Sequence, residues 1–213
     1  MKRLALSAAT ATLLVGFAGA ASASPDSAHH GRGAAGIFWF MQLSDSHIGA
    51  SQLVYPNAPN HLEFALGEAV DVIAPTFVVN TGDLVDGSAN NIPTSGQEQG
   101  EWDDYRAILD QAGMTADFYF DLPGNHDGYA DIGMTYYLAN SLQGETNNAF
   151  FTDWLVTTPV AQHYFFGLNS NGNGSGPGIV DPSGDPRFTS DEIANLNAGL
   201  QANSSAALVF TFG

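Results

Sequence analysis

Three short groups of polar residues carry side chains that commonly bind metal ions. They are residues 45–47 (Asp-Ser-His), residues 82–86 (Gly-Asp-Leu-Val-Asp) and residues 124–127 (Gly-Asn-His-Asp). Carboxylate oxygens, imidazole nitrogens and an amide oxygen, without any sulfur, suit Mn, Fe, Zn, Co or Ni. The three groups are therefore candidate metal ligands, and the residue types leave the choice among these metals open.

The first two groups, taken alone, also have simple structural explanations. An Asp-x-His sequence occurs by chance in many proteins, although residues two apart on a strand point to the same face and can reach one cation. Asp83 could merely accept hydrogen bonds from backbone amides in a Gly-Asp turn. Residues 124–127 are the most specific group, because a solvated turn needs only Asn-Gly or Asp-Gly.

Each group follows an apolar run that predicts a short buried strand. The runs are 37–43, 77–79 and 118–122, and apolar residues at helical spacing predict helices between them, over about 60–73 and 102–112. Strands that alternate with helices indicate a layered α/β fold. Because such sheets gather ligands at the carboxyl ends of their strands, this alternation places the polar groups at one edge.

The last third of the chain continues the same alternation. Strands are predicted over 160–168 and 206–212, with a helix that begins at Thr189 or Ser190 and ends at Leu200,. The three tryptophans of the chain are expected in the core. The sequence contains no cysteine, so neither a disulfide nor a thiolate ligand is available,.

The order of the three polar groups, each after a β-like run, resembles the calcineurin-like metallophosphoesterase family. Asp45 and Asp83 are 38 positions apart, and Asp83 and Asn125 are 42 apart, which is ordinary for that family. The resemblance implies an α/β fold in which two β-sheets form a sandwich flanked by helices. It also implies a metal-dependent phosphoester hydrolase that uses a dinuclear metal site and a bridging hydroxide.

The resemblance further implies which side chains bind the two metal ions, each divalent or trivalent. Asp45 and His47 would bind one ion, Asp83 would bridge both, and Asn125 would bind the second. A bridging carboxylate holds two cations at a separation that stabilises both oxygens of an in-line displacement. The substrate implied is a small phosphoester, whether a monoester, a diester or a nucleotide.

By the same resemblance, His126 would lie beside the phosphate as a proton donor or charge stabiliser, oriented by Asp127. The family also has a later lone histidine and a Gly-His-x-His group, whereas the last histidine here, His163, is expected to be a strand residue. The chain ends at Gly213, directly after a predicted strand. We therefore expect a metallophosphoesterase domain that is incomplete at its C-terminus.

Two other functions are compatible with these residues. A degenerate or truncated relative could bind metal without catalysis, so a catalytically inactive metal-binding fragment is the main alternative. The second possibility is an acidic surface protein in which the three groups serve only as turns. The presence or absence of the later histidines in the continuing reading frame would separate the enzyme from the binder.

The N-terminal residues predict export from the cytoplasm. A basic start, an apolar stretch and Ala21-Ser22-Ala23 indicate a signal peptide over 1–23, followed by a flexible leader over 24–36 and the domain over 37–213,. The protein is thus expected to be secreted or periplasmic. No later apolar run approaches the ~20 residues of a membrane span, so no anchor is expected after cleavage.

The charge of the chain restricts its partners. It has 22 acidic residues against 5 Lys and Arg, a formal net charge of −17. Such a surface repels polyanions, so binding to a nucleic-acid backbone or to anionic lipid is not expected. The sequence gives no indication of the oligomeric state.

Overall fold

The computed structural model describes most of the chain from residue 37 onward. The described residues are 37–50, 57–87, 96–131, 133–147, 151–169, 188 and 190–213. The predicted signal peptide and leader lie outside the described residues, so the domain boundaries proposed for them are not tested. Among the described residues, no helix has both the length and the apolar character needed to cross a bilayer.

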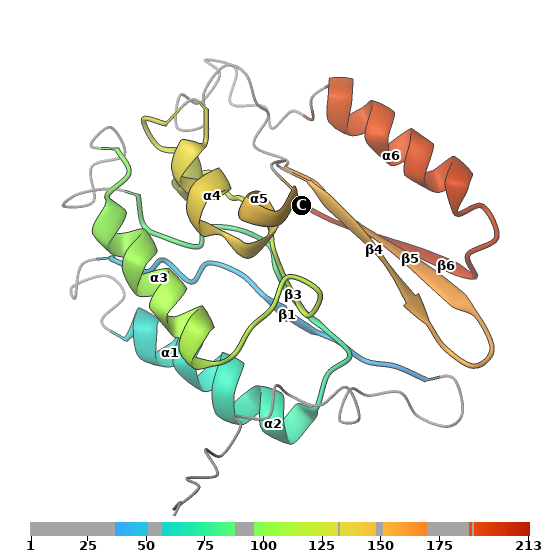
Figure 1. Cartoon of the computed structure of the whole chain (residues 1–213), viewed down its shortest axis with the longest axis horizontal. Coiled ribbons are helices and arrows are strands. Elements are labelled where there is room, and N and C mark those ends of the chain that lie inside the picture. Colours follow the sequence, from blue (N-terminus) through green and yellow to red (C-terminus); the bar gives the residue numbers. More distant parts are fainter. Residues whose placement is uncertain are drawn as a thin grey trace, which may run out of the picture.

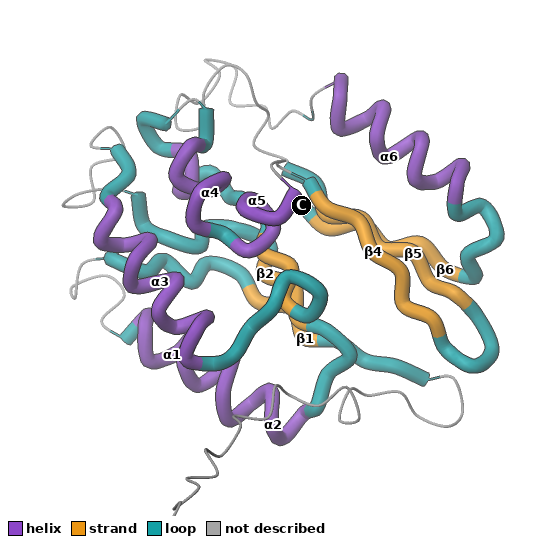
Figure 2. The backbone as a smooth tube through the Cα atoms, viewed as in Figure 1, coloured by secondary structure: helices purple, strands orange, loops and turns teal. Residues whose placement is uncertain are grey.

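The first sheet contains the three strands that precede the polar groups. Strands β1 (Met41–Leu43), β2 (Val78–Asn80) and β3 (Tyr119–Asp121) are parallel and lie in the order β1-β2-β3. Figure 2 shows β1 and β2 in this sheet. In their register, Val78 lies opposite both Met41 and Tyr119. All three carboxyl ends therefore meet at one edge of the sheet, as the sequence predicts.

The second sheet is built from the C-terminal half of the chain. Strand β4 (Thr152–Thr157) is antiparallel to β5 (Gln162–Gly167), and β5 is parallel to β6 (Leu208–Phe212). Its strand order is β4-β5-β6. Figure 1 shows this sheet facing the first one, with helices outside both. His163 lies on β5, where it is a strand residue as expected.

Helices on the outside of the first sheet come from between its strands. α1 (Ala58–Phe64), the π-helical turn η1 (Ala65–Ala69) and α2 (Val70–Ile73) form one continuous segment, and α3 (Gln99–Gln111) follows. The first segment begins earlier than the sequence predicts, because Pro59 has the fixed φ angle that suits a first helical turn,.

Three further helices complete the layers. α4 (Thr135–Asn140) and α5 (Leu142–Asn147) lie on the side of the first sheet, and α6 (Ser190–Ala202) covers the second (Figure 1). α4, α5 and strand β4 were not predicted from the sequence. α6 confirms the predicted C-terminal helix, and it packs Leu196 and Leu200 against the buried part of β5.

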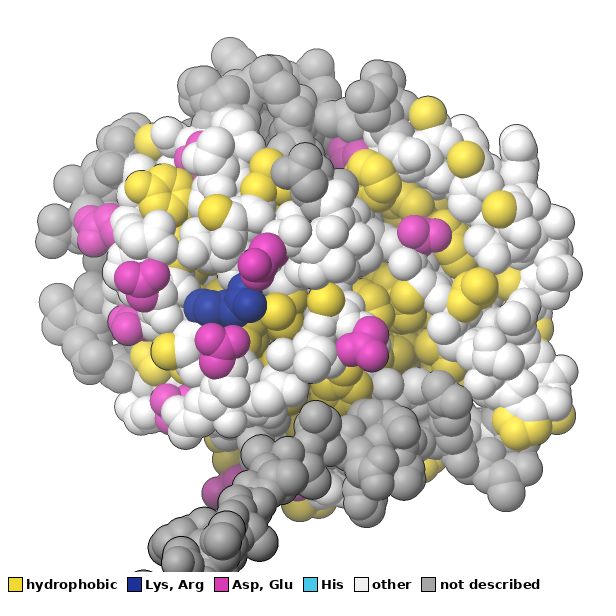
Figure 3. Space-filling view, in the orientation of Figure 1, with side chains coloured by type: hydrophobic (Ala, Val, Ile, Leu, Met, Phe, Trp, Pro, Cys, Tyr) yellow, Lys and Arg dark blue, Asp and Glu magenta, His cyan; other side chains and the backbone are white. Residues whose placement is uncertain are grey.

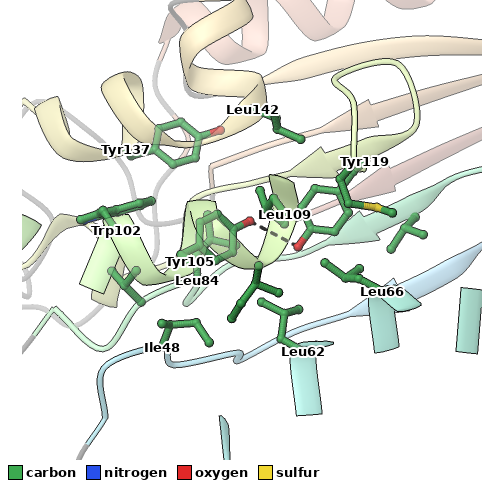
Figure 4. Close-up of a cluster of buried hydrophobic side chains, with 14 of the residues drawn as sticks. Ile48, Leu62, Leu66, Leu84, Trp102, Tyr105, Leu109, Tyr119, Tyr137 and Leu142 are labelled. Carbon is green, nitrogen blue, oxygen red and sulfur yellow. Dashed lines mark hydrogen bonds between the residues drawn. The ribbon is translucent and has the colours of Figure 1, made fainter. Parts of the chain in front are cut away.

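Successive side chains of the first sheet point to opposite faces and pack into two separate cores. Val78 and Tyr119 point toward the helices, where they pack with Trp102, Tyr105 and other buried residues (Figure 4). The next positions, Val79 and Phe120, point the opposite way and pack between the two sheets. This is the period-two pattern of a sheet that is buried on both faces.

The core between the sheets is rich in aromatic rings. Phe120 stacks on Trp154 with ring centroids 3.9 Å apart, and Phe40 stacks on Phe77 at 4.8 Å. The two sheets and their flanking helices confirm the predicted fold class. One expectation is wrong: Trp39, which lies before β1, is 42% exposed, and its indole N–H donates to the carbonyl of Ile73.

Candidate metal centre

The loops after β1 and β2 run side by side beyond the edge of the first sheet. The backbone N–H of Asp45 donates to the carbonyl of Gly82 at 3.0 Å, and that of His47 donates to the carbonyl of Asp83 at 2.9 Å. Ile48 then pairs with Val85 in a short parallel bridge. These bonds place the first and second polar groups in contact.

The third loop reaches the second through two glycines. A Cβ on Gly82 would overlap the backbone of Gly124, and a Cβ on Gly124 would overlap Asp83. Gly82 also has a φ of 113°, which side chains rarely adopt,. The glycines of the second and third groups therefore let two turns approach each other more closely than any other residue would allow.

Asp45, His47 and Asp83 converge on one point. Nε2 of His47 lies 3.7 Å from Oδ1 of Asp45 and 3.7 Å from Oδ2 of Asp83. The His47 side chain is buried, whereas that of Asp45 is 64% exposed, so the group opens to solvent on one side. Two atoms that bind one cation at about 2.1 Å lie about 3 to 4 Å apart, so these three side chains fit a metal ion,.

His47, Asp86 and His126 form a second, more buried group that also has the spacing to hold a cation. Oδ1 of Asp86 lies 3.3 Å from Nδ1 of His47, and the backbone carbonyl oxygen of Asp86 lies 2.6 Å from Nδ1 of His126. A carbonyl oxygen can only accept, so Nδ1 of His126 carries the proton in this contact. Asp86 thereby faces the Nδ1 atoms of both histidines.

Asp127 has different neighbours from those expected. It is completely buried, and its carboxylate accepts hydrogen bonds from the backbone N–H groups of Leu84, Val85 and Gly124 at 2.7 to 3.1 Å. Burial and the nearby charge of Asp83 raise the pKa of Asp127 to about 8, against the effect of these amides. Asp127 therefore joins the second and third loops, and His126 faces Asp86 instead.

Asn125 is exposed and lies directly before the short helix η3 (His126–Gly128). Its amide nitrogen donates to the hydroxyl of Tyr129 at 2.9 Å, which leaves the amide oxygen as the atom that suits a metal ion,. The same loop is tied to the second one by Asp83, whose Oδ1 accepts the backbone N–H of His126 at 2.9 Å. The second and third groups are thus brought together.

Three of the predicted ligands have unusual backbone conformations. Asp45, His47 and Asp83 have φ angles of 57°, 44° and 53°, in the left-handed region. Each such residue costs on the order of 1–3 kcal/mol and persists where the surroundings enforce it, often at functional sites. Here the enforcing contacts are the backbone hydrogen bonds that join the first loop to the second.

Sequence reasoning gave no role to two residues that the structure places beside these loops. Asp86, the second aspartate of Gly-Asp-Leu-Val-Asp, contacts both histidines, and its place in that motif was the available signal. Glu101 on α3 is buried and accepts a hydrogen bond from the N–H of Gly87 at 2.9 Å. Nothing in the sequence near Glu101 distinguishes it from the exposed acids of the same helix.

Comparison with known proteins assigns the chain to the same family that the order of its three polar groups resembles. A sequence model of the calcineurin-like phosphoesterase family matches residues 38–200. An Arabidopsis thaliana protein named as a candidate metallophosphoesterase is 28% identical over 145 residues, which cover 63% of this chain and 19% of that protein. Transmembrane protein 62 of Mus musculus is 37% identical over 94 residues, 44% of this chain and 14% of that protein. The chain therefore matches only a small part of these relatives.

Proposed function

Because this chain belongs to the calcineurin-like phosphoesterase family, we propose that it supplies the metal site for hydrolysis of a small phosphoester. The observation that carries the proposal is the convergence of Asp45, His47 and Asp83 at one sheet edge, with His126 beside them. The residues assigned to the two cations are Asp45, His47 and Asp83 for one, and Asp83 and Asn125 for the other.

The contact with Asp86 prepares His47 for metal binding. Its Nδ1 faces the Asp86 carboxylate, so the proton resides there and Nε2 is left with a lone pair toward Asp45 and Asp83. A carboxylate behind a metal-binding histidine fixes its orientation and makes it a stronger ligand. We therefore assign Asp86 to holding His47, and place the cation on the Nε2 side.

Asp83 is suited to serve two cations because its carboxylate lies between the loops. Its Oδ2 faces Nε2 of His47, while its Oδ1 lies on the side of the third loop, where Asn125 precedes His126. When bound, the cations supply Lewis-acid stabilisation of the phosphate oxygens and an activated water. Asp83 is therefore the residue that would hold both cations.

His126 is placed to act on the substrate itself. The proton on its Nδ1 is held by the carbonyl of Asp86, so Nε2 is the nitrogen available to a phosphate oxygen. The His126 side chain is 22% exposed, against 5% for His47. A partly exposed imidazole with one nitrogen fixed can hold or donate a proton at the leaving oxygen.

The charges of the described residues favour a role for bound cations. Among the described residues Arg106 is the only Lys or Arg, and it is paired with Asp110 at 3.2 Å and Glu145 at 2.8 Å. Acidic side chains predominate over basic ones on the face shown in Figure 3. Within the described part of the chain, a phosphoester anion beside Asp45, Asp83 and Asp86 would meet carboxylates, and bound metal ions would supply the positive charge that it needs,.

A metal-binding protein without turnover is the second candidate. It is favoured by the ligand count, because Asp83 and Asn125 are the only residues assigned to the second cation. A single tightly bound ion would satisfy Asp45, His47 and Asp83 without assembling a dinuclear centre. The two candidates differ in metal stoichiometry as well as in activity.

The test is to remove metals from the whole chain, titrate it with Mn²⁺ or Zn²⁺, and follow hydrolysis of aryl phosphate monoesters and diesters. The enzyme predicts two bound ions and turnover that an Asp83→Asn variant loses. One bound ion without turnover supports the binder. A chain that binds neither metal contradicts both.

We also propose that the protein is exported and secreted or periplasmic, on the strength of residues 1–23. N-terminal sequencing of protein from its natural host should begin near Ser24,. Protein that is recovered from the cytoplasm with Met1 in place contradicts this proposal.

A further inference from the structure

The start of helix α3 contacts the loops of all three polar groups. Gln97, two residues before the helix, donates through Nε2 to the carbonyl oxygen of His126 at 2.8 Å and to that of Tyr129 at 3.4 Å. Its own Oε1 accepts the indole N–H of Trp102 at 2.8 Å. The Gln97 side chain is therefore held from behind while its two N–H groups bind the third loop.

Glu101, in the first turn of the helix, contacts the other two loops. Its Oε2 accepts the backbone N–H of Gly87, the residue that follows Asp86, at 2.9 Å. On the first loop, a Cβ at Gly49 would overlap the Glu101 carboxylate, so the two are packed with no space between them. Gly49 lies two residues after His47.

Helix α3, which carries Glu101 and begins two residues after Gln97, has a firmly packed inner face. Trp102, Tyr105 and Leu109 are completely buried in the core between the helices and the first sheet (Figure 4). Catalytic groups are most precisely placed when residues locked by packing support them. An isolated surface loop with the same hydrogen bonds would not offer that support.

We propose that Gln97 and Glu101 are positioning residues that set the separation between the metal ligands and His126. Gln97 places His126, and Glu101 places the loops of His47 and Asp86. The inference rests on the proposed function, because the separation matters only if these groups act on one metal-bound substrate. Neither side chain is assigned to a metal or to the substrate.

A Gln97→Glu variant separates positioning from mere packing. It keeps the volume of the side chain and the acceptor for Trp102, but replaces the two N–H donors with an oxygen that faces the carbonyls of His126 and Tyr129. Gln99→Glu is the matched control, because Gln99 lies two residues further along and its amide nitrogen donates to the side chains of Asp103 and Asn140 instead of the third loop.

We expect the ring resonances of His126 in NMR spectra of the metal-free chain to shift in Gln97→Glu and to stay in place in Gln99→Glu. Affinity for the first Mn²⁺ ion should change less than about threefold, because Gln97 holds none of its proposed ligands, which are Asp45, His47 and Asp83. In an active preparation, kcat should fall about tenfold or more with KM unchanged, since small misplacements of a catalytic group are costly.

Glu101 is tested by a pair of variants. Glu101→Ala should lower Mn²⁺ affinity about tenfold, in the range found for residues that orient metal ligands. Glu101→Gln should restore most of that affinity, because its amide oxygen can still accept the N–H of Gly87. Rescue by the isosteric variant shows that the hydrogen bond matters, not the charge.

The NMR and metal-binding measurements do not depend on catalysis. If the wild-type chain binds Mn²⁺ but hydrolyses nothing, the proposed function fails while these measurements still decide the positioning roles. Unchanged His126 resonances in Gln97→Glu, or equal Mn²⁺ affinity in Glu101→Ala and the wild type, would overturn the inference.

Discussion

The carboxylate of Asp83 accepts the backbone N–H of His126 at 2.9 Å, and its other oxygen lies 3.7 Å from Nε2 of His47. One side chain thus links the second and third loops and faces the first. A change at Asp83 should disturb both proposed cation sites, whereas a change at His126 removes a side chain that binds no proposed metal. Substitutions at these two residues are therefore expected to differ in their effect on metal content.

Asp83→Asn should lower metal affinity by more than about tenfold, because even residues that only orient metal ligands contribute about 10–100-fold. Metal content after equilibrium dialysis against Mn²⁺ is the measurement. Asp71→Asn is a suitable control, since Asp71 is exposed on α2 and changes the net charge equally. Equal metal content in both variants would rule out a ligand role for Asp83.

His126→Ala should keep the metal content of the wild type and lose turnover. The physical reason is that its Nδ1 is engaged by the carbonyl of Asp86, so only Nε2 is free, and we assign it to a substrate oxygen,. Dialysis and an aryl phosphate assay on the same sample give both quantities. Metal loss as large as that of Asp83→Asn would show that His126 is itself a ligand.

Asp45→Gly should be more stable than Asp45→Ala by about 1 kcal/mol in the metal-free state. The backbone of Asp45 has a φ of 57°, which glycine adopts freely and alanine does not,. Urea denaturation in the presence of a chelator measures the difference. Both variants lose the same carboxylate, so equal stabilities would contradict a strained backbone at this position.

The strand-and-loop part of the fold could be predicted because its signals are local. Short apolar runs that end at polar groups identify β1, β2 and β3, and the glycines before Asp83 and Asn125 mark turns. The contacts that join the turns could not be predicted. They depend on the exact register of the parallel strands, which sets the residue pairs that meet between segments about 40 positions apart,.

The elements and contacts that the sequence did not predict were missed for other physical reasons. Strand β4 alternates in burial, but its residue types do not show this, because polar Thr152 is buried and apolar Leu155 is exposed. α5 begins where the Asp121 carboxylate accepts its first backbone N–H groups, a contact that no local residue announces. The role of Asp86 depends on two histidines that are distant in the sequence.

Asp121→Ala should destabilise the chain by about 3 kcal/mol or more. The buried carboxylate accepts hydrogen bonds from the N–H groups of Leu142 and Gln143 and from the hydroxyl of Tyr105, and each unpaired donor costs roughly 1–3 kcal/mol,. Asp117→Ala, which removes an exposed carboxylate, should stay within about 0.5 kcal/mol,. Urea midpoints for both variants decide whether Asp121 is a structural anchor.

Glu101 should make the metal-free chain less stable as the pH rises from about 4.5 to 7. Burial, with smaller contributions from Asp86 and Glu98, raises the pKa of Glu101 from 4.5 to about 7. In that interval the folded chain holds a proton that the unfolded chain has released. Folding therefore takes up a proton, and the free energy of unfolding falls with pH until the folded carboxyl also ionises.

Asp121 and Asp127 have raised pKa values as well, so the wild-type curve alone does not isolate Glu101. The difference between the wild type and Glu101→Gln does, because Gln cannot titrate and retains an acceptor for Gly87. We expect this variant to gain stability relative to the wild type between about pH 5 and pH 8, as measured by urea denaturation with a chelator present. Parallel curves for the two proteins would mean that Glu101 ionises alike in the folded and unfolded chains, and its buried contact with the Gly87 amide would then have to stabilise the charge fully.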